Sequence, residues 1–476
     1  MLPFMDSSSF LQHLVRDFPY QLTNSQEKLL KSLTDYLVSG SRDIFLLKGY
    51  AGTGKTTLIS TLVNNLGHAG KNFVLLAPTG RASKVMSSYA GVPAYTLHKH
   101  LYYPSVDQLG RPQFSLKRNK AKNTLYIVDE ASMISSQNKG EDLLNASSVL
   151  SDLIDFVYSG EGNQLILSGD KAQLPPVGTD LSPALDAEYL KKNFDKNVQE
   201  FELNEIVRQT LDSGILYNAT KIRDLITGKA QGELKLDIYG FKDIIRLIDG
   251  YDIQDAIEFA YSGKGFEDTA IVVRSNKRAN LYNQQIRSKV LLKESEIDAG
   301  DYLMVVKNNY FWLEKNAPAA FIANGDIIEI LEIFDMEERY GFKFAKTKVR
   351  MLDYPAQAPF ETVLLLDTLH SHSPSLTYAE QNKLYQKIYD ELSGLPTKWQ
   401  RYKKIKENPY FNALQVKFAY ALTGHKSQGG QWDYVFVEQP YHFDARNKED
   451  LRWLYTAFTR AKKKLFLIGF QDEYFE

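Results

Sequence analysis

The chain has 476 residues, with 57 Lys or Arg and 58 Asp or Glu, for a formal net charge of −1. This length predicts roughly two to four domains. The charge balance excludes a uniformly basic nucleic-acid coat protein but permits a local basic groove. The sequence has no cysteine, which excludes disulfides, thiol catalysis and Cys-ligated metal sites. Since no apolar run reaches roughly 18 residues and no signal-peptide pattern is seen, we expect a cytoplasmic protein without a membrane segment.

In chain order, the first half alternates short apolar runs with amphipathic stretches such as residues 58–66. Apolar runs of this kind are typical of strands buried on both faces of a parallel sheet with crossover helices. The sequence therefore predicts an α/β fold here, with strands at 44–47, 73–76, 125–128 and 165–167.

The second half repeats this pattern around a long insertion. Further buried-type strands are expected at 270–273, 434–437 and 465–468, with helices at 280–290 and 450–458. The insertion has a different texture, with antiparallel strands expected at 327–334, 343–353 and 361–367, a helix at 378–392 and a polar, aromatic segment to 410. This indicates a second α/β domain interrupted by a β-rich module.

Residues 49–56 read GYAGTGKT and match the P-loop pattern G-x-x-x-x-G-K-[ST]. They follow a predicted strand and open a predicted helix, which is the context that the motif requires. Backbone N–H groups of such a loop surround phosphates, Lys55 would reach the β- and γ-phosphates, and the Thr56 hydroxyl would bind Mg²⁺. The predicted ATP-binding residues of this loop are Gly49, Ala51, Gly52, Thr53, Gly54, Lys55, Thr56 and Thr57.

Acidic residues follow the next strands of the predicted sheet. After a P-loop, Asp129 is expected to hold Mg²⁺ and Glu130 to activate the attacking water. Residues 169–176, GDKAQLPP, also end a strand, and Gln173 is expected to report the presence of the γ-phosphate. Without the P-loop, Asp129 and Glu130 would be interpreted as an ordinary acidic strand end, and residues 169–176 as a Pro-rich turn.

Two arginines are predicted to reach the transferred phosphate from elsewhere in the chain. Arg208 lies in NEIVRQ and Arg460 in YTAFTRAK. An arginine finger stabilises the charge that develops during phosphoryl transfer. The alternative for each is a surface salt bridge.

The motif order from Gln26 to Arg460 resembles that of a superfamily-1 helicase of the 5′-to-3′ subgroup, which includes RecD-like and phage Dda-like enzymes. The resemblance rests on the P-loop and on eight further motifs: 22–26 (LTNSQ), 77–82 (APTGRA), 96–98 (TLH), 129–132 (DEAS), 169–176, 207–209 (VRQ), 423–429 (TGHKSQG) and 455–462 (YTAFTRAK). The chain departs from the family at Gln431, where Glu is frequent, and residues 133–163 have no role that the family supplies.

The resemblance implies further site residues. Gln26 would read the adenine edge, and Gln428 and Gly429 would contact the nucleotide. Contacts to single-stranded DNA are expected from Pro78, Thr79, Thr96, His98, Tyr103, Thr423, His425, Lys426 and Ser427.

The resemblance also implies the domain layout. Two RecA-like P-loop domains with parallel sheets would comprise residues 1–98 with 121–200, and 201–300 with 413–476. Residues 99–120 would form a β-hairpin pin and 301–412 an SH3-like β accessory domain. We expect the pin to separate strands through an aromatic tip made by Tyr102 and Tyr103, with the basic residues of 117–122 on phosphates. The alternative is an exposed hairpin with a solvated charge run.

Together these features predict an ATP- and Mg²⁺-dependent DNA helicase and single-strand translocase that acts on single-stranded and on forked or tailed duplex DNA, as a monomer and without a membrane. The 5′-to-3′ direction follows from the resemblance alone. An RNA or RNA–DNA helicase stays open, because stacking and phosphate contacts do not exclude the 2′-OH. So does a nucleotide-switched clamp that binds without unwinding, although such a clamp would not need Glu130.

Overall fold

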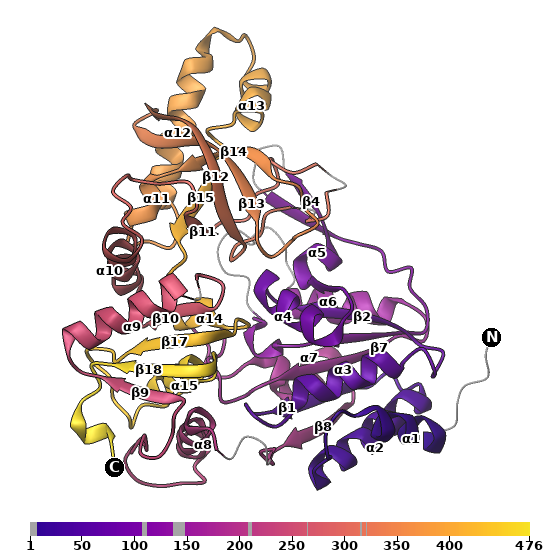
Figure 1. Cartoon of the computed structure of the whole chain (residues 1–476). Helices are drawn as coiled ribbons and strands as arrows, with labels where there is room; N and C mark the ends of the chain where they lie inside the picture. Colours follow the sequence, from indigo (N-terminus) through magenta and orange to yellow (C-terminus); the bar gives the residue numbers. More distant parts are fainter. Residues whose placement is uncertain are drawn as a thin grey trace.

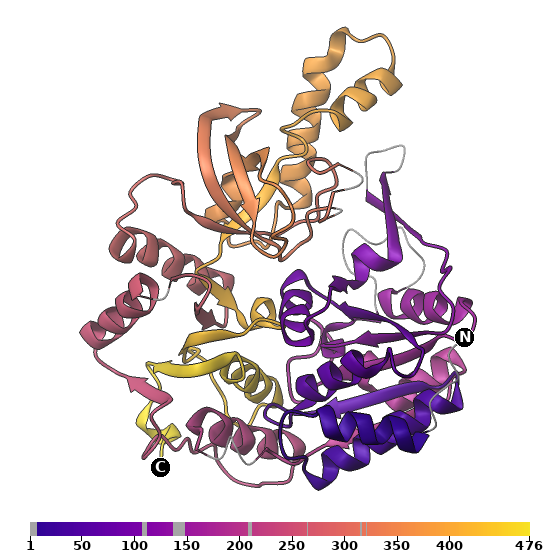
Figure 2. The ribbon, with the colours of Figure 1, turned by 45° about the vertical axis from the view of Figure 1, so that its right-hand side comes forward.

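The computed structural model describes residues 7–106, 112–136, 148–207, 212–263, 265–314, 317–319 and 321–476. Two parallel sheets stand beside each other, and a small β-barrel with attached helices lies above them (Figure 1). The same arrangement is seen after a 45° turn (Figure 2). Across these ranges, no helix is long and apolar enough to cross a membrane.

The first sheet has six parallel strands in the order β3-β2-β6-β7-β1-β8. Their bounds are β1 Ile44–Gly49, β2 Asn72–Ala77, β3 Ala94–Thr96, β6 Thr124–Val128, β7 Gln164–Gly169 and β8 Val198–Leu203. The accompanying helices are α1 Ser7–Asp17, α2 Asn24–Ser39, α3 Lys55–Asn65, α4 Gly80–Ala90, α5 Leu97–Leu101, α6 Val149–Ser159 and α7 Ala187–Phe194, with 3₁₀ turns at Ala131–Met133 and Pro183–Leu185.

Separate apolar clusters lie on the two faces of this sheet, so its strands are buried on both sides. Since β8 ends at Leu203, the first sheet extends beyond the predicted boundary at residue 200. That strand, VQEFEL, has three polar residues among its six, and it lies at the edge of the sheet, where a strand is less buried.

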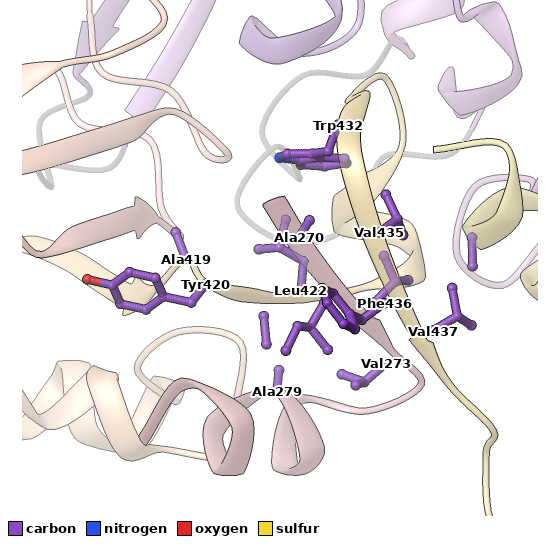
Figure 3. Close-up of a cluster of buried hydrophobic side chains, with 14 of the residues drawn as sticks. Ala270, Val273, Ala279, Ala419, Tyr420, Leu422, Trp432, Val435, Phe436 and Val437 are labelled. Atoms are coloured by element: carbon purple, nitrogen blue, oxygen red, sulfur yellow. The ribbon is translucent and has the colours of Figure 1, made fainter. Parts of the chain in front are cut away.

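The second sheet has five parallel strands in the order β16-β10-β17-β18-β9. Their bounds are β9 Ile244–Leu247, β10 Thr269–Val273, β16 Ala421–Thr423, β17 Trp432–Glu438 and β18 Ala461–Ile468. The helices are α8 Gly214–Thr227, α9 Gly250–Gly263, α10 Asn276–Gln285 with a π-helical turn Ile286–Val290, α14 Gly424–Ser427, α15 Lys448–Phe458 and a 3₁₀ turn Asp472–Tyr474. Figure 3 shows side chains of β10 and β17 meeting in its core. The predicted fold class, two RecA-like parallel-sheet domains with β-rich insertions, is confirmed.

The insertion forms a closed five-stranded barrel, β11-β12-β13-β14-β15. Its strands are β11 Tyr302–Val305, β12 Ile327–Arg339, β13 Phe342–Met351, β14 Phe360–Leu365 and β15 Leu414–Phe418, and its helices are α11 Asp367–His370, α12 Tyr378–Glu391, α13 Lys398–Lys406 and a 3₁₀ turn Leu392–Gly394. The predicted end of this domain at residue 412 is wrong, because β15 pairs with both β11 and β14 and closes the barrel. The polar, aromatic segment to 410 contains α13.

The predicted hairpin is present as β4 Tyr102–Val106 paired antiparallel with β5 Pro112–Leu116. The aromatic tip is wrong for Tyr102 and Tyr103. Both begin β4, directly after α5, so they pair with Leu116 and Ser115 at the base of the hairpin. The turn signal at 109–111 lies outside the described residues, as do Arg208 and residues 137–147.

Candidate functional site

The glycine-rich loop joins β1 to α3 at the edge where the parallel strands end. Gly52 and Gly54 have φ angles of 76° and 78°, a backbone conformation that favours glycine. A Cβ on Gly54 would stand 2.6 Å from Nε2 of Gln26. The helix α3 starts at Lys55, so its unpaired N–H groups face this loop. The arrangement has the chemistry of a phosphate cradle.

Gln26 supports this cradle from α2. Its Nε2 donates a hydrogen bond to the Thr53 carbonyl (2.9 Å), and its Oε1 accepts one from the Thr23 N–H (2.9 Å). The side chain is 1% exposed. Both ends of the amide therefore have protein partners in this conformation, and adenine recognition by Gln26 stays a prediction.

Asp129 follows β6 and faces the P-loop. Ser168 Oγ donates a hydrogen bond to Asp129 Oδ1 (2.8 Å), and the Lys55 ammonium lies 4.0 Å from the same oxygen. Thr56 follows in the first turn of α3. Within the described ranges, no three His, Cys, Asp or Glu side chains are placed to hold a metal by themselves. Mg²⁺ at nucleotide sites takes most ligands from phosphate and water, so one carboxylate and one hydroxyl fit this ion.

Glu130 is a buried carboxylate beside that position. Its backbone is left-handed, with φ 52°, and its Oε2 is buried without a hydrogen-bond partner among the described residues. Burial raises the pKa of Glu130 above its usual range, an effect that the nearby charges of Arg460 and Lys55 reduce. A carboxylate with a raised pKa and a free oxygen is suited to accept a proton from water.

Arg460 reaches this carboxylate from the second sheet. Its Nη1 lies 4.0 Å from Glu130 Oε1. The guanidinium is held by hydrogen bonds to the carbonyls of Thr456 (3.0 Å) and Gly430 (3.1 Å), and the residue is 3% exposed. Gln173 lies in the same interface at 6% exposure, with its Oε1 unpartnered among the described residues. The structure thus brings together Lys55, Asp129, Glu130 and Arg460, and Gln173 adjoins Leu174, which bonds to Thr456 of the second domain.

Tyr455 is a residue of this site that sequence reasoning did not single out. Its hydroxyl donates to Asp170 Oδ2 (2.6 Å) and accepts from the P-loop N–H of Ala51 (2.9 Å). Burial raises the pKa of Tyr455 well above its usual range, and burial also raises that of Asp170. A tyrosine in a buried helix is ordinarily core packing, so only its proximity to Arg460 in the sequence offered a signal.

Two of the predicted DNA contacts act as helix caps. Thr79 Oγ1 accepts a hydrogen bond from Ala82 N (3.2 Å) at the start of α4, and Thr96 Oγ1 accepts one from Lys99 N (3.3 Å) at the start of α5. Thr96 is only 3% exposed. Pro78 precedes the first cap. Helix N-termini favour phosphate, so these caps place two such ends along one edge of the first sheet.

The predicted contacts near the hairpin differ in exposure. Tyr103 is 62% exposed, and the Lys117 ammonium lies 5.3 Å from its ring. Tyr102 is buried and donates a hydrogen bond to Asp152 (2.7 Å). His98 packs against the Tyr102 ring at 5.7 Å. Of this group, Tyr103 has the face that a base could stack on.

The motif at 423–429 is largely enclosed by the interface between the sheets. Ser427 is fully buried and donates to the Gly424 carbonyl (2.8 Å), while Gln428 Nε2 donates to the Leu174 carbonyl (2.7 Å). A Cβ on Gly429 would stand 2.6 Å from Ala82 of α4. Neither Ser427 nor Gln428 is open to a ligand in this conformation.

Thr423, His425 and Lys426 lie at the same motif, at the end of β16 and in α14. Burial lowers the pKa of Lys426 to about 8, and burial lowers that of His425 as well. Because burial disfavours a charged ammonium, a phosphate beside Lys426 would restore its charge. Their predicted contacts to DNA stay predictions.

A cavity of about 450 Å³ lies where α4, β17 and the barrel meet. The Arg81 guanidinium stacks over the Trp432 ring at 4.6 Å, and Tyr89 Oη donates to Gln431 Oε1 at 3.2 Å. Lys84 donates to the Leu352 carbonyl of the barrel (3.1 Å). All three parts of the chain therefore line the cavity: the two sheet domains supply cationic and aromatic side chains, and the carboxylates Glu267, Asp268 and Asp353 also face it.

These features define a class. A P-loop and acidic strand ends on one RecA-like sheet face an arginine carried by a second RecA-like sheet, as in P-loop motor proteins that hold a nucleoside triphosphate between two domains.

Comparison with known proteins narrows this class. A family model described as "AAA domain" matches residues 21–249, and one described as "UvrD-like helicase C-terminal domain" matches residues 418–468. The ATP-dependent DNA helicase Dda of Enterobacteria phage T4 is 23% identical over 89% of this chain and 93% of its own length. An uncharacterised protein of Acanthamoeba polyphaga mimivirus is 24% identical over 94% of this chain and 99% of its own.

Among solved structures, the Pif1 helicase from Bacteroides in complex with ADP-AlF3 and ssDNA covers 96% of this chain and 95% of its own at 16% identity, with a TM-score of 0.48. The motifs, the two facing sheets and the family matches make this chain a superfamily-1 helicase of the type that includes Dda, Pif1 and RecD. As a P-loop protein of this type, it binds a nucleotide.

Proposed function

We propose that this protein is an ATP-dependent DNA helicase that moves along single-stranded DNA, in the 5′-to-3′ direction. The observation that carries the proposal is the approach of Arg460 to Glu130 across the two sheets, at 4.0 Å. A water-activating carboxylate and a cation from the other domain meet at one point, which a hydrolysing motor requires.

In this proposal the P-loop N–H groups and Lys55 hold the phosphates of ATP. Glu130 takes a proton from water as the water oxygen attacks the γ-phosphorus and the bond to the β-phosphate oxygen breaks. Mg²⁺, bound by Thr56 and Asp129, would neutralise phosphate charge. Arg460 and Arg208 would stabilise the transferring group.

Arg460 also explains how hydrolysis becomes movement. Its contact to the γ-phosphate exists only while the two domains are closed, so ATP favours the closed state and its hydrolysis products favour opening. Two hydrogen bonds cross the same interface: Gln428 Nε2 donates to the Leu174 carbonyl, and the Leu174 N–H donates to Thr456 Oγ1. Alternate grip by the two domains would then step the strand.

The cavity beside Arg81 and Trp432 supports a binding path for single-stranded DNA. Stacking on aromatic rings and contact with cations hold single strands without sequence preference. Relatives named as ATP-dependent DNA helicases, of phage T4 and of Saccharomyces cerevisiae, favour DNA over RNA as the track. The clamp alternative is disfavoured by the unpartnered carboxylate oxygen of Glu130, since a clamp needs no base.

Strand displacement from two partial duplexes, one with a 5′ tail and one with a 3′ tail, tests the proposal with ATP hydrolysis followed in parallel. Displacement only from the 5′-tailed duplex supports both the helicase activity and the 5′-to-3′ direction. Displacement only from the 3′ tail overturns the direction. Strand-stimulated hydrolysis that opens neither duplex overturns the helicase in favour of the clamp.

A further inference from the structure

Two helices project from the barrel away from both parallel sheets (Figures 1 and 2). They are α12 and α13, and with the turn between them they comprise residues 378–406, here named the helical arm. None of the motifs of the ATP site lies on this arm. ATP hydrolysis therefore does not account for the residues that the arm exposes.

The helical arm is firmly attached to the barrel. Leu384, Ile388 and Ile405 are at most 3% exposed and pack in one cluster with Phe344 and Tyr410. Each helix also starts with a reciprocal capping box. Because buried apolar contacts and caps fix the arm, its exposed side chains are carried on a stable support.

The helix α13, with the sequence KWQRYKKIK, has five basic residues and no acidic one. Lys398 and Lys403 are exposed and form no ion pair with any carboxylate among the described residues. Lys404 pairs with Glu407 at 3.1 Å. In a chain of net charge −1, α13 therefore concentrates positive charge, of which Lys398 and Lys403 have no carboxylate partner among the described residues.

An aromatic side chain lies among these cations. Trp399 is 69% exposed, and the Lys403 ammonium lies 5.8 Å from its ring. Tyr378, at the start of α12, is 82% exposed. The Trp399 ring is therefore open to a stacking partner beside the lysines of α13. Cations with an open aromatic face suit phosphates and nucleobases better than an acidic peptide, which would use the cations alone.

The position of the arm favours duplex over the threaded single strand. In both views it extends beyond the barrel, on the side opposite the two sheets, while the β4–β5 hairpin stands beside the barrel at the same end of the molecule (Figures 1 and 2). DNA that reaches the arm lies outside the path proposed between the sheets. We expect the hairpin to separate the strands, so DNA on its outer side would still be paired.

We propose that the basic face of the helical arm, Lys398, Trp399 and Lys403, is a second nucleic-acid site that binds the phosphate backbone of duplex DNA outside the motor. The proposal rests on the proposed helicase function for its setting. Contact with the duplex holds the substrate in front of the hairpin between steps, so the site affects duplex binding and unwinding rather than hydrolysis.

The test compares Lys398→Gln/Lys403→Gln with the unaltered protein. Affinity for a blunt duplex, a 5′-tailed duplex and a single strand is measured against salt concentration. Each lysine that contacts a phosphate contributes about 0.9 to the slope of log K against log salt, so the double variant loses about 1.8 on duplex. Its single-strand affinity and strand-stimulated ATP hydrolysis stay unchanged.

The matched control is Lys191→Gln/Lys192→Gln, which removes the same charge from exposed positions of α7 on the first domain. This control is expected to keep the duplex slope. Trp399→Ala is expected to weaken duplex affinity severalfold with the slope unchanged, because it removes no charge. Circular dichroism and melting temperature confirm that all three variants fold.

A duplex slope equal to that of the control variant overturns the proposal, as does an equal loss on single strands, which would assign the arm to the track. An arm variant that keeps every nucleic-acid affinity favours an acidic protein partner and also overturns it. Because duplex binding is measured without ATP, failure of the helicase assay leaves this result interpretable and bears only on the proposed function.

Discussion

The two parallel sheets have the same construction, yet only the first ends its strands in a phosphate-binding apparatus. Beside that sheet, glycines at positive φ shape the loop after β1, and carboxylates follow β6 and β7. In the second sheet the loop after β10 is closed. Ser275 caps α10 by accepting from Arg278 N (3.2 Å), and Arg274 pairs with Glu449 (2.8 Å).

Both sheets present strand ends at one edge, and the residues at those ends decide whether that edge binds phosphate. One sheet has the groups that hold phosphate. The other contributes Tyr455 from α15 and Arg460 from the turn between α15 and β18, and both contact the first domain only while the two domains lie together. One nucleotide bound between the two RecA-like domains is therefore sufficient to couple their movements.

The largest expected effect comes from the P-loop lysine. Lys55→Ala removes the cation aimed at the phosphates, so ATP hydrolysis is expected to fall by about 10²-fold or more. Nucleotide affinity, measured by titration with a fluorescent analogue, falls as well. The matched variant Arg274→Ala, at the strand end of the second sheet, keeps nucleotide affinity. Equal losses in the two variants would contradict the division between the sheets.

Glu130→Gln is expected to lower kcat by roughly 10²- to 10⁴-fold while ATP and DNA still bind, because only the proton acceptor is lost. In the unaltered protein the carboxyl pKa is raised, so kcat falls with acidity at a pH above the ordinary 4.5 of glutamate. The pH profile of strand-stimulated hydrolysis checks this. Wild-type turnover in Glu130→Gln would show that another residue accepts the proton.

Tyr455→Phe tests the contact that joins the sheets directly. Loss of the hydroxyl leaves the buried Asp170 without this donor, at a cost of about 1–3 kcal/mol in stability. It also frees the Ala51 N–H, so nucleotide affinity is expected to rise severalfold. Melting temperature and nucleotide titration measure the two changes. If neither moves, the hydroxyl does not couple the domains.

The smallest effect is expected where the first domain meets the barrel. Lys99 Nζ lies 3.5 Å from Asp326 Oδ2, and burial raises the pKa of Asp326 to about 6. A raised pKa contributes stability that is complete below the unfolded value of about 4 and is lost as pH rises through about 6. Asp326→Asn lacks this titration, so its melting temperature declines less over that range.

Asp326→Asn is also a control for the comparison of the two sheets, because the Lys99–Asp326 contact lies outside both of them. Strand-stimulated ATP hydrolysis at neutral pH is expected to stay within about twofold of the unaltered protein, because the Lys99–Asp326 contact belongs to neither the P-loop nor the Glu130–Arg460 pair. Parallel melting curves of the two proteins between pH 4 and pH 6 would contradict the assignment of the raised pKa to Asp326.

The sequence by itself determined the features that neighbouring residues dictate. Buried apolar runs indicated both parallel sheets, and the loop at 49–56 and the acids at 129–130 lie at strand ends because turn and strand are set locally. The edge strand β8 and the barrel strand β15 were missed, since their pattern depends on what lies beside them.

Only the tertiary structure decided the contacts between distant parts of the chain. Tyr455 meets Ala51 across 404 positions, and Arg460 meets Glu130 across the same interface. The tyrosines expected at a hairpin tip lie at its base, because α5 ends immediately before β4. Such contacts depend on how domains pack, and packing is a property of whole surfaces that no local pattern specifies.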